Sequence, residues 1–129
     1  AEDTGALHPG EFLVQAGAEF LLTQSVYGAA VVREFTDRYA QEAGERISAP
    51  VFYGVPVLVK DGIAFGQIPE VMRRDLEKGR KGSDMAIELV HVLMDAGCDA
   101  FYLVPPILRG GVRDNVVAQE VIAAARRGR

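Results

Sequence analysis

The residues best suited to bind a small molecule follow an apolar run near the start of the chain. Segment 20–22 (Phe-Leu-Leu) is followed by Thr23, Gln24 and, after two further residues, Tyr27. A strand buried on both faces of a parallel sheet reads as continuous apolar sequence, and α/β proteins bind ligands just beyond the carboxyl ends of such strands. This pattern predicts that Gln24 and Tyr27 lie where a substrate binds. In the simpler alternatives, Gln24 caps the next helix and Tyr27 packs beside the site.

A second candidate site follows the last apolar run, where Arg109-Gly110-Gly111 precede a helical segment. The two glycines, the free amides at the start of that helix and Arg113 could cradle a phosphate, as loops after the last strands of β/α barrels often do. Asp114 partly opposes an anion at this position. The alternative is an ordinary strand-to-helix turn.

Composition indicates one globular domain over residues 1–129, because 49% of the residues are hydrophobic and 25% are charged. The net charge of −4 disfavours a nucleic-acid partner. A short basic cluster, Lys78, Arg80 and Lys81, is interrupted by glycine and is predicted to be a solvated loop rather than a polyanion site. Dinucleotide fingerprints, phosphate-binding loops and serine-nucleophile turns do not occur in the sequence.

The single cysteine, Cys98, excludes an internal disulfide and leaves no ligand set for structural zinc. It follows the helix-ending Gly97 and is predicted to be a packed apolar residue in a protein of a reducing, cytoplasmic compartment. His8 and His91 are too isolated to indicate a metal site. No apolar run reaches the roughly 20 residues of a membrane span.

Helical and apolar segments alternate along the chain. The sequence predicts strands over 18–23, over 51–59 with a stop near Pro56, and over 100–104. It predicts helices that end over 9–16 and that span 29–43, 68–76, an N-cap at Ser83 to Gly97, and 113–126. Residues 78–82 are predicted to form a flexible link. The residues predicted to be buried on the helices are Val31, Phe35, Tyr39, Met85, Leu89, Val92, Leu93, Val117, Val121 and Ile122.

This order predicts an α/β fold of parallel β/α crossover units. Three strands do not complete a (β/α)8 TIM barrel, which needs eight strands and usually about 250 residues. The chain is therefore interpreted as roughly the second half of a barrel and as part of a longer protein. Two alternatives stay open, in which self-association completes the sheet or the chain forms a compact three-stranded layer.

Residues 15–24, Gln-Ala-Gly-Ala-Glu-Phe-Leu-Leu-Thr-Gln, followed by Val26-Tyr27, resemble the fifth-to-sixth-strand region of methylenetetrahydrofolate reductases. Later pieces resemble the same family in the same order: segments 51–58, 68–72, 86–89 with 96–97, 102–106, and Arg109. Only the first of these matches is specific by itself. The resemblance covers nearly the whole chain from about Gln15.

The resemblance implies a barrel that binds FAD at its carboxyl-end mouth, where NAD(P)H and the folate stack on the flavin in turn. It implies that the flavin carries the hydride and that the protein supplies placement and charge. Gln24 matches a strand-end glutamine that contacts folate or nicotinamide, and an amide offers the donor and acceptor that a pterin edge requires. Arg109 matches an arginine that grips the glutamate end of the folate.

The departures from the family concern catalysis. The acidic residue that promotes iminium formation and most flavin contacts belong to the first half of the family's barrel, so the catalytic and cofactor-binding residues of this chain stay unknown. The family has a longer helix, which includes an aromatic residue that moves with substrate, where this chain has only segment 60–67. Phe65 is a weak substitute for that aromatic residue. Residues 1–11 also differ from the long helix that the family has at this place. Missing residues are suspected at both places.

Three functions follow from these observations. The first is flavin-dependent reduction of 5,10-methylenetetrahydrofolate, for which this chain supplies the folate side. The second is a non-catalytic half-barrel that serves in binding or assembly. The third is a phosphate-binding αβ enzyme that uses the 109–114 turn. The exposed sheet edges of a half-barrel predict an oligomer, or completion by the remainder of a longer chain.

Overall fold

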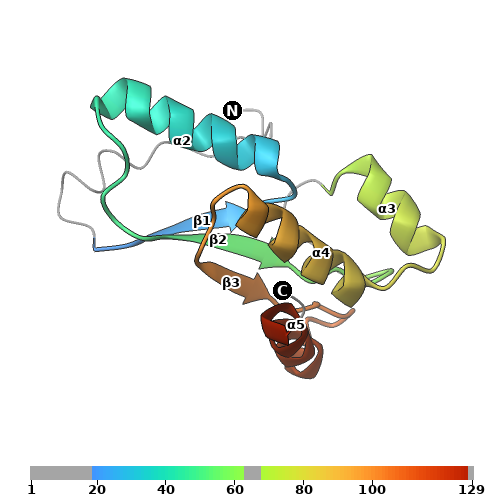
Figure 1. Ribbon diagram of the computed structural model, residues 1–129. Helices are drawn as coiled ribbons and strands as arrows, with labels where there is room; N and C mark the ends of the chain where they lie inside the picture. Colours follow the sequence, from blue (N-terminus) through green and yellow to red (C-terminus); the bar gives the residue numbers. More distant parts are fainter. Residues whose placement is uncertain (1–18, 63–67, 128–129) are drawn as a thin grey trace.

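A three-stranded parallel sheet packed against helices forms the protein (Figure 1). The structure is a computed structural model, and it describes residues 19–62 and 68–127. The strands are β1 (Leu21–Ser25), β2 (Val51–Pro56) and β3 (Phe101–Val104), in the order β1-β2-β3 with both pairs parallel. The helices are α2 (Ala29–Ala43), α3 (Glu70–Glu77), α4 (Gly82–Asp95) and α5 (Asn115–Arg127).

The predicted α/β class with parallel β/α units is confirmed, and each predicted strand is present within a few residues of its expected bounds. Because every crossover returns the chain to the same end of the sheet, all three carboxyl ends lie along one edge (Figure 1). The helix end predicted over 9–16, His8 and most of segment 60–67, with Phe65, lie outside the described residues.

One hydrophobic core joins the helices to one face of the sheet. Its most buried members are Val26, Val32, Phe35, Tyr53, Val55, Val57, Ala86, Leu89, Val90, Leu93 and Val121. The buried stripes of the helices are therefore close to those predicted. The predicted burial of Val92 and Ile122 is wrong, because these side chains are 41% and 40% exposed. Val92 lies at the margin of the buried stripe of α4, about 100° around the helix from Leu93, and its side chain stays partly exposed there.

The start of α4 differs from its prediction. The helix begins at Gly82, its N-cap residue is Lys81, and no side chain caps it, so Ser83 is not the N-cap. Gly82 is buried rather than part of a flexible link, because the first turn of α4 packs on the backbone of Leu58, just after β2. A methyl group on Gly82 would overlap the Leu58 carbonyl oxygen. Close packing, not a polar cap, fixes this helix end.

Alternate residues of the strands point away from the helix-packed core. On β1 and just before it, Phe20 and Leu22 are 54% and 61% exposed, and Phe20 meets Phe52 of β2 edge-to-face with 5.9 Å between ring centroids. Among the described residues, β1 and β3 each pair only with β2. The sheet therefore has an apolar face and two outer edges that the described residues leave open.

We expect these open edges and the exposed apolar face to make the protein associate in solution. Leu22→Lys should reduce the associated fraction, because it places a charge on that face. It should cost little folding stability, since the Leu22 side chain is mostly exposed. Val71→Lys is the matched control, since Val71 is 68% exposed on α3. Light scattering measures the mass; a monodisperse monomer for the unmodified protein would contradict the prediction.

Candidate functional site at the carboxyl edge of the sheet

The loops that follow the strands gather at the carboxyl edge. The loop after β2 contacts the loop after β3, because Gly62 lies so close to Ile107 that a Cβ atom would be 2.7 Å from the Ile107 carbonyl oxygen. Gly62 also donates its N–H to the Val59 carbonyl. These contacts hold the exits of β2 and β3 together, and Gln24, near the end of β1, lies on the other side of β2.

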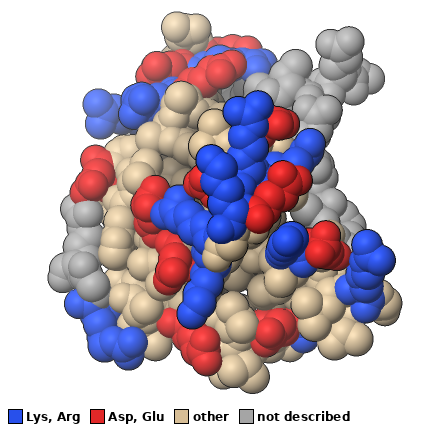
Figure 2. Space-filling model, turned by 90° about the vertical axis from the view of Figure 1, so that its right-hand side faces the viewer, with Lys and Arg blue, Asp and Glu red and all other residues tan. Residues whose placement is uncertain are grey.

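Charges of both signs are mixed on this side of the molecule. Figure 2 views the side toward which the strands run and shows Lys and Arg side chains interspersed with Asp and Glu. The predicted basic cluster is exposed, and Arg80 pairs with Asp75 at 3.2 Å and with Glu88. These hydrogen bonds raise the pKa of Arg80. The cluster is therefore a partly neutralised surface loop, which agrees with its interpretation as solvated.

Strand β1 is irregular where it reaches this edge. Leu22 pairs with Phe52 and Ser25 with Gly54, so β1 uses three residues where β2 uses two. This extra residue is a β-bulge. The Thr23 hydroxyl lies in the irregular stretch, accepts a hydrogen bond from the Gly54 N–H at 3.1 Å and donates to the Gln24 carbonyl at 2.7 Å. Thr23 is thus a buried connector between β1 and β2.

Tyr102 of β3 reaches across β2 to the same stretch. It pairs with Gly54 in the parallel ladder, and its hydroxyl donates to the Thr23 carbonyl of β1. Burial raises the pKa of Tyr102, which keeps the hydroxyl protonated as a donor. This contact was not predicted from the sequence. The available signal was Gly54, since an isolated glycine inside an apolar strand often marks a close approach.

The structure places the two residues predicted near the first strand differently. Gln24 is exposed at the carboxyl end of β1. Tyr27 is half-buried, its pKa is raised by burial, and it lines a small void with Pro56, Met72 and Leu89. The position of Gln24 suits contact with a ligand, whereas the surroundings of Tyr27 favour the alternative in which it packs beside the site.

Arg109 lies in a tight turn after β3. The Leu108 N–H donates to the Val112 carbonyl and the Gly111 N–H to the Leu108 carbonyl, while Gly110 and Gly111 have φ of +90° and +85°. Glycine permits this left-handed pair. Arg109 is exposed in the turn. Gln24 lies near the end of β1 and Arg109 beyond the end of β3, so both residues lie toward the same edge of the sheet, on opposite sides of β2.

The start of α5 is already occupied by a carboxylate. The Asp114 Oδ1 accepts the Val117 N–H at 3.2 Å, and Ile107 forms an antiparallel bridge with Arg113. An anion at this helix start would meet the Asp114 charge and would compete for an amide that already has a partner. This geometry counts against the phosphate-binding interpretation of the 109–114 turn.

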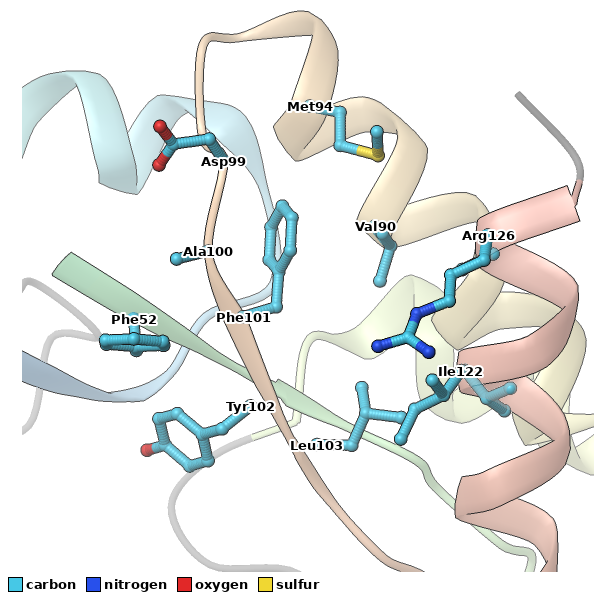
Figure 3. Close-up of a pocket in the computed structure, with 12 residues that line it drawn as sticks. Phe52, Val90, Met94, Asp99, Ala100, Phe101, Tyr102, Leu103, Ile122 and Arg126 are labelled. Atoms are coloured by element: carbon cyan, nitrogen blue, oxygen red, sulfur yellow. The ribbon is translucent and has the colours of Figure 1, made fainter. Parts of the chain in front are cut away.

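A groove of about 690 Å³ lies against the outer edge of β3 (Figure 3). It is mainly apolar, with Phe101, Leu103, Met94 and Ile122 among its lining residues and the Arg126 guanidinium extended over it. The groove also reaches Phe52 of β2, and among the described residues β3 has no strand partner on its side away from β2. In a closed barrel a further strand would pair along this edge, so we interpret the groove as a consequence of the open sheet rather than as the substrate site.

Among the residues that the structure describes, the remaining reactive side chains form no second site. Cys98 is buried, and burial together with Asp99 raises its pKa to about 11, as expected of a packed thiol rather than a nucleophile. His91 is half-buried on α4. Within residues 19–62 and 68–127, no group of three or more His, Cys, Asp or Glu side chains could hold a metal ion, and no helix is long and apolar enough to cross a membrane.

Comparison with known proteins gives a match in structure. No family model matches the chain, and a search of curated proteins finds no match. Among solved structures, the fold is similar to a Clostridium thermocellum protein described as uncharacterized and as binding two copies of 5-methyl-5,6,7,8-tetrahydrofolic acid. The TM-score is 0.61 at 15% sequence identity, over 88% of this chain and 44% of that one. The chain thus shares its α/β fold with part of a larger folate-binding protein and spans less than half of that protein's length.

Proposed function

We propose that this chain forms the folate-binding side of a parallel β/α barrel, and that the complete barrel reduces 5,10-methylenetetrahydrofolate with a flavin and NAD(P)H. One observation carries the folate part of the proposal. An exposed glutamine, Gln24, stands at the carboxyl end of a parallel strand in a fold similar to that of a methyltetrahydrofolate-binding protein. The resemblance of residues 15–24 to methylenetetrahydrofolate reductases supports the reductase part.

The geometry suits a folate, which is long and has different chemistry at its two ends. The Gln24 amide can donate and accept at the pterin edge. Arg109 lies beyond β3 at the same edge and can bind a carboxylate of the glutamate tail through two parallel hydrogen bonds. Exposed Phe20 and Leu22, with Phe52, offer apolar surface on the sheet face that looks away from the helices.

The described residues alone do not fit FAD. A pyrophosphate would require a cluster of free backbone amides or cations, but Asp114 caps the start of α5 and Arg80 is held by Asp75 and Glu88. We therefore assign no flavin contact to these residues. In this proposal the flavin site belongs to the part of the barrel that completes the sheet, and the flavin would supply the hydride chemistry.

The non-catalytic half-barrel is the second candidate, and the open edges of β1 and β3 favour it. In both candidates the sheet is completed by further chain. They differ in whether the completed barrel holds a flavin. Flavin absorbance of the purified protein distinguishes them: a yellow protein whose absorbance is bleached by NAD(P)H supports the reductase, and a colourless assembly that binds folate supports the non-catalytic subunit.

Calorimetric titration of the purified protein with 5-methyltetrahydrofolate tests the folate proposal. We expect saturable binding that Gln24→Ala weakens about tenfold, which corresponds to the loss of one or two hydrogen bonds. Gln41→Ala is the matched control, because Gln41 is an exposed glutamine on α2. Arg113→Ala should leave binding unchanged, which separates this site from a phosphate site at the turn. Absence of binding, or equal binding by Gln24→Ala and Gln41→Ala, would contradict the proposal.

A further inference from the structure

The bulge in β1 removes regular ladder pairing at the residue that the proposed function needs most. Regular pairing stops after Leu22 and resumes at Ser25. Thr23 and Gln24 lie between these positions and have no Cα partner in the register of the ladder. Buried peptide groups are costly when unpaired, so hydrogen bonds to the main chain here constrain this stretch of the strand.

Two side-chain hydrogen bonds bind the main chain on either side of Gln24. The Tyr102 hydroxyl donates to the carbonyl of Thr23, which belongs to the peptide unit before Gln24. The Thr23 hydroxyl donates to the carbonyl of Gln24, which belongs to the peptide unit after it. Each peptide unit is planar, so a hydrogen bond to each of them restrains φ and ψ of Gln24. The direction of its Cα–Cβ bond is restrained with them.

The contact from Tyr102 depends on a glycine in the intervening strand. A Cβ atom on Gly54 would lie 2.7 Å from the Tyr102 hydroxyl oxygen and 2.8 Å from the ring carbon that bears it. The same atom would lie 3.1 Å from the Gln24 carbonyl oxygen. Gly54 therefore leaves the space through which Tyr102 crosses β2 to reach β1.

From these contacts we infer that Tyr102 is a positioning residue for ligand binding: it acts through Thr23 to hold Gln24 in the orientation that meets the pterin. This inference rests on the proposed folate function. It assigns to β3, the strand farthest from β1, a role in the affinity of a residue on β1. Tyr102 need not touch the ligand for this role.

A double-mutant cycle tests whether Tyr102 acts through Gln24. Tyr102→Phe keeps the ring and removes the donor, and should weaken 5-methyltetrahydrofolate binding about fivefold. In the Gln24→Ala background the same change should have no further effect, because the side chain that it positions is gone. Tyr53→Phe, on the adjacent strand and in the core, is the matched control and should bind normally. Equal losses in both backgrounds, or no loss at all, would overturn the inference.

A measurement without ligand separates failure of this inference from failure of the proposed function. If the unmodified protein does not bind 5-methyltetrahydrofolate, the folate proposal is wrong, but backbone amide dynamics at Gln24 still test the positioning. Nuclear magnetic resonance relaxation should show greater mobility at Gln24 in Tyr102→Phe and in Gly54→Ala than in Tyr53→Phe. Unchanged relaxation at Gln24 in both variants would show that Tyr102 does not hold this residue.

Discussion

Gly82→Ala should lower the free energy of unfolding by about 3 kcal/mol, the upper end of the usual cost of overpacking. The added methyl group would overlap the carbonyl oxygen of Leu58, and a backbone atom cannot move aside as the end of a flexible side chain can. Relief requires α4 to shift away from the exit of β2, which also disturbs core residues such as Leu89 and Leu93. Urea unfolding at one protein concentration measures the effect.

Ser83→Ala is the matched control at the next position. A serine that caps a helix contributes about 1 kcal/mol, but the Ser83 side chain makes no capping hydrogen bond, and the N-cap residue is Lys81. We therefore expect Ser83→Ala to change stability by less than about 0.5 kcal/mol. A larger loss in Ser83→Ala than in Gly82→Ala would mean that a polar cap, not close packing, fixes the start of α4.

This helix start illustrates what the sequence can and cannot establish. The residues 83–95 have the period of a buried helix, so the element and its end near Gly97 were predictable; Gly97 has φ of +99° and follows the helix as expected. The start was misplaced because serine is a common N-cap and glycine a common linker residue. Only the position of Leu58 in space, 24 residues earlier in the chain, shows that Gly82 must lack a side chain.

The candidate site was predictable to the same degree. The polar residues after an apolar run predicted the carboxyl end of a strand near Gln24, and β1 does end one residue later, at Ser25. The contacts that hold Gln24 join three strands, since Thr23, Gly54 and Tyr102 are separated by 31 and 48 residues. No local pattern connects such residues. The register of the parallel ladder connects them, through the pairing of Gly54 with Tyr102 and the bulge in β1.

Leu93→Ala should also lower the free energy of unfolding by about 3 kcal/mol, within the range for leucines truncated in a core. Leu93 is completely buried on α4 and belongs to the cluster that includes Val55 of β2 and Val121 of α5. The helix and the sheet meet at this side chain, so its removal leaves a cavity that neither can easily fill. Urea unfolding of the variant and the unmodified protein gives the difference.

Val92→Ala, one residue earlier, should change stability by less than about 0.5 kcal/mol, because Val92 is 41% exposed and alanine favours the helix. The pair thus tests the orientation of α4. If α4 were rotated so that Val92 shared the core with Leu93, as the sequence pattern predicts, both variants would be strongly destabilised. A large loss for Leu93→Ala alone places the helix as the structure has it, with Val90 and Leu93 toward the sheet and Val92 to one side.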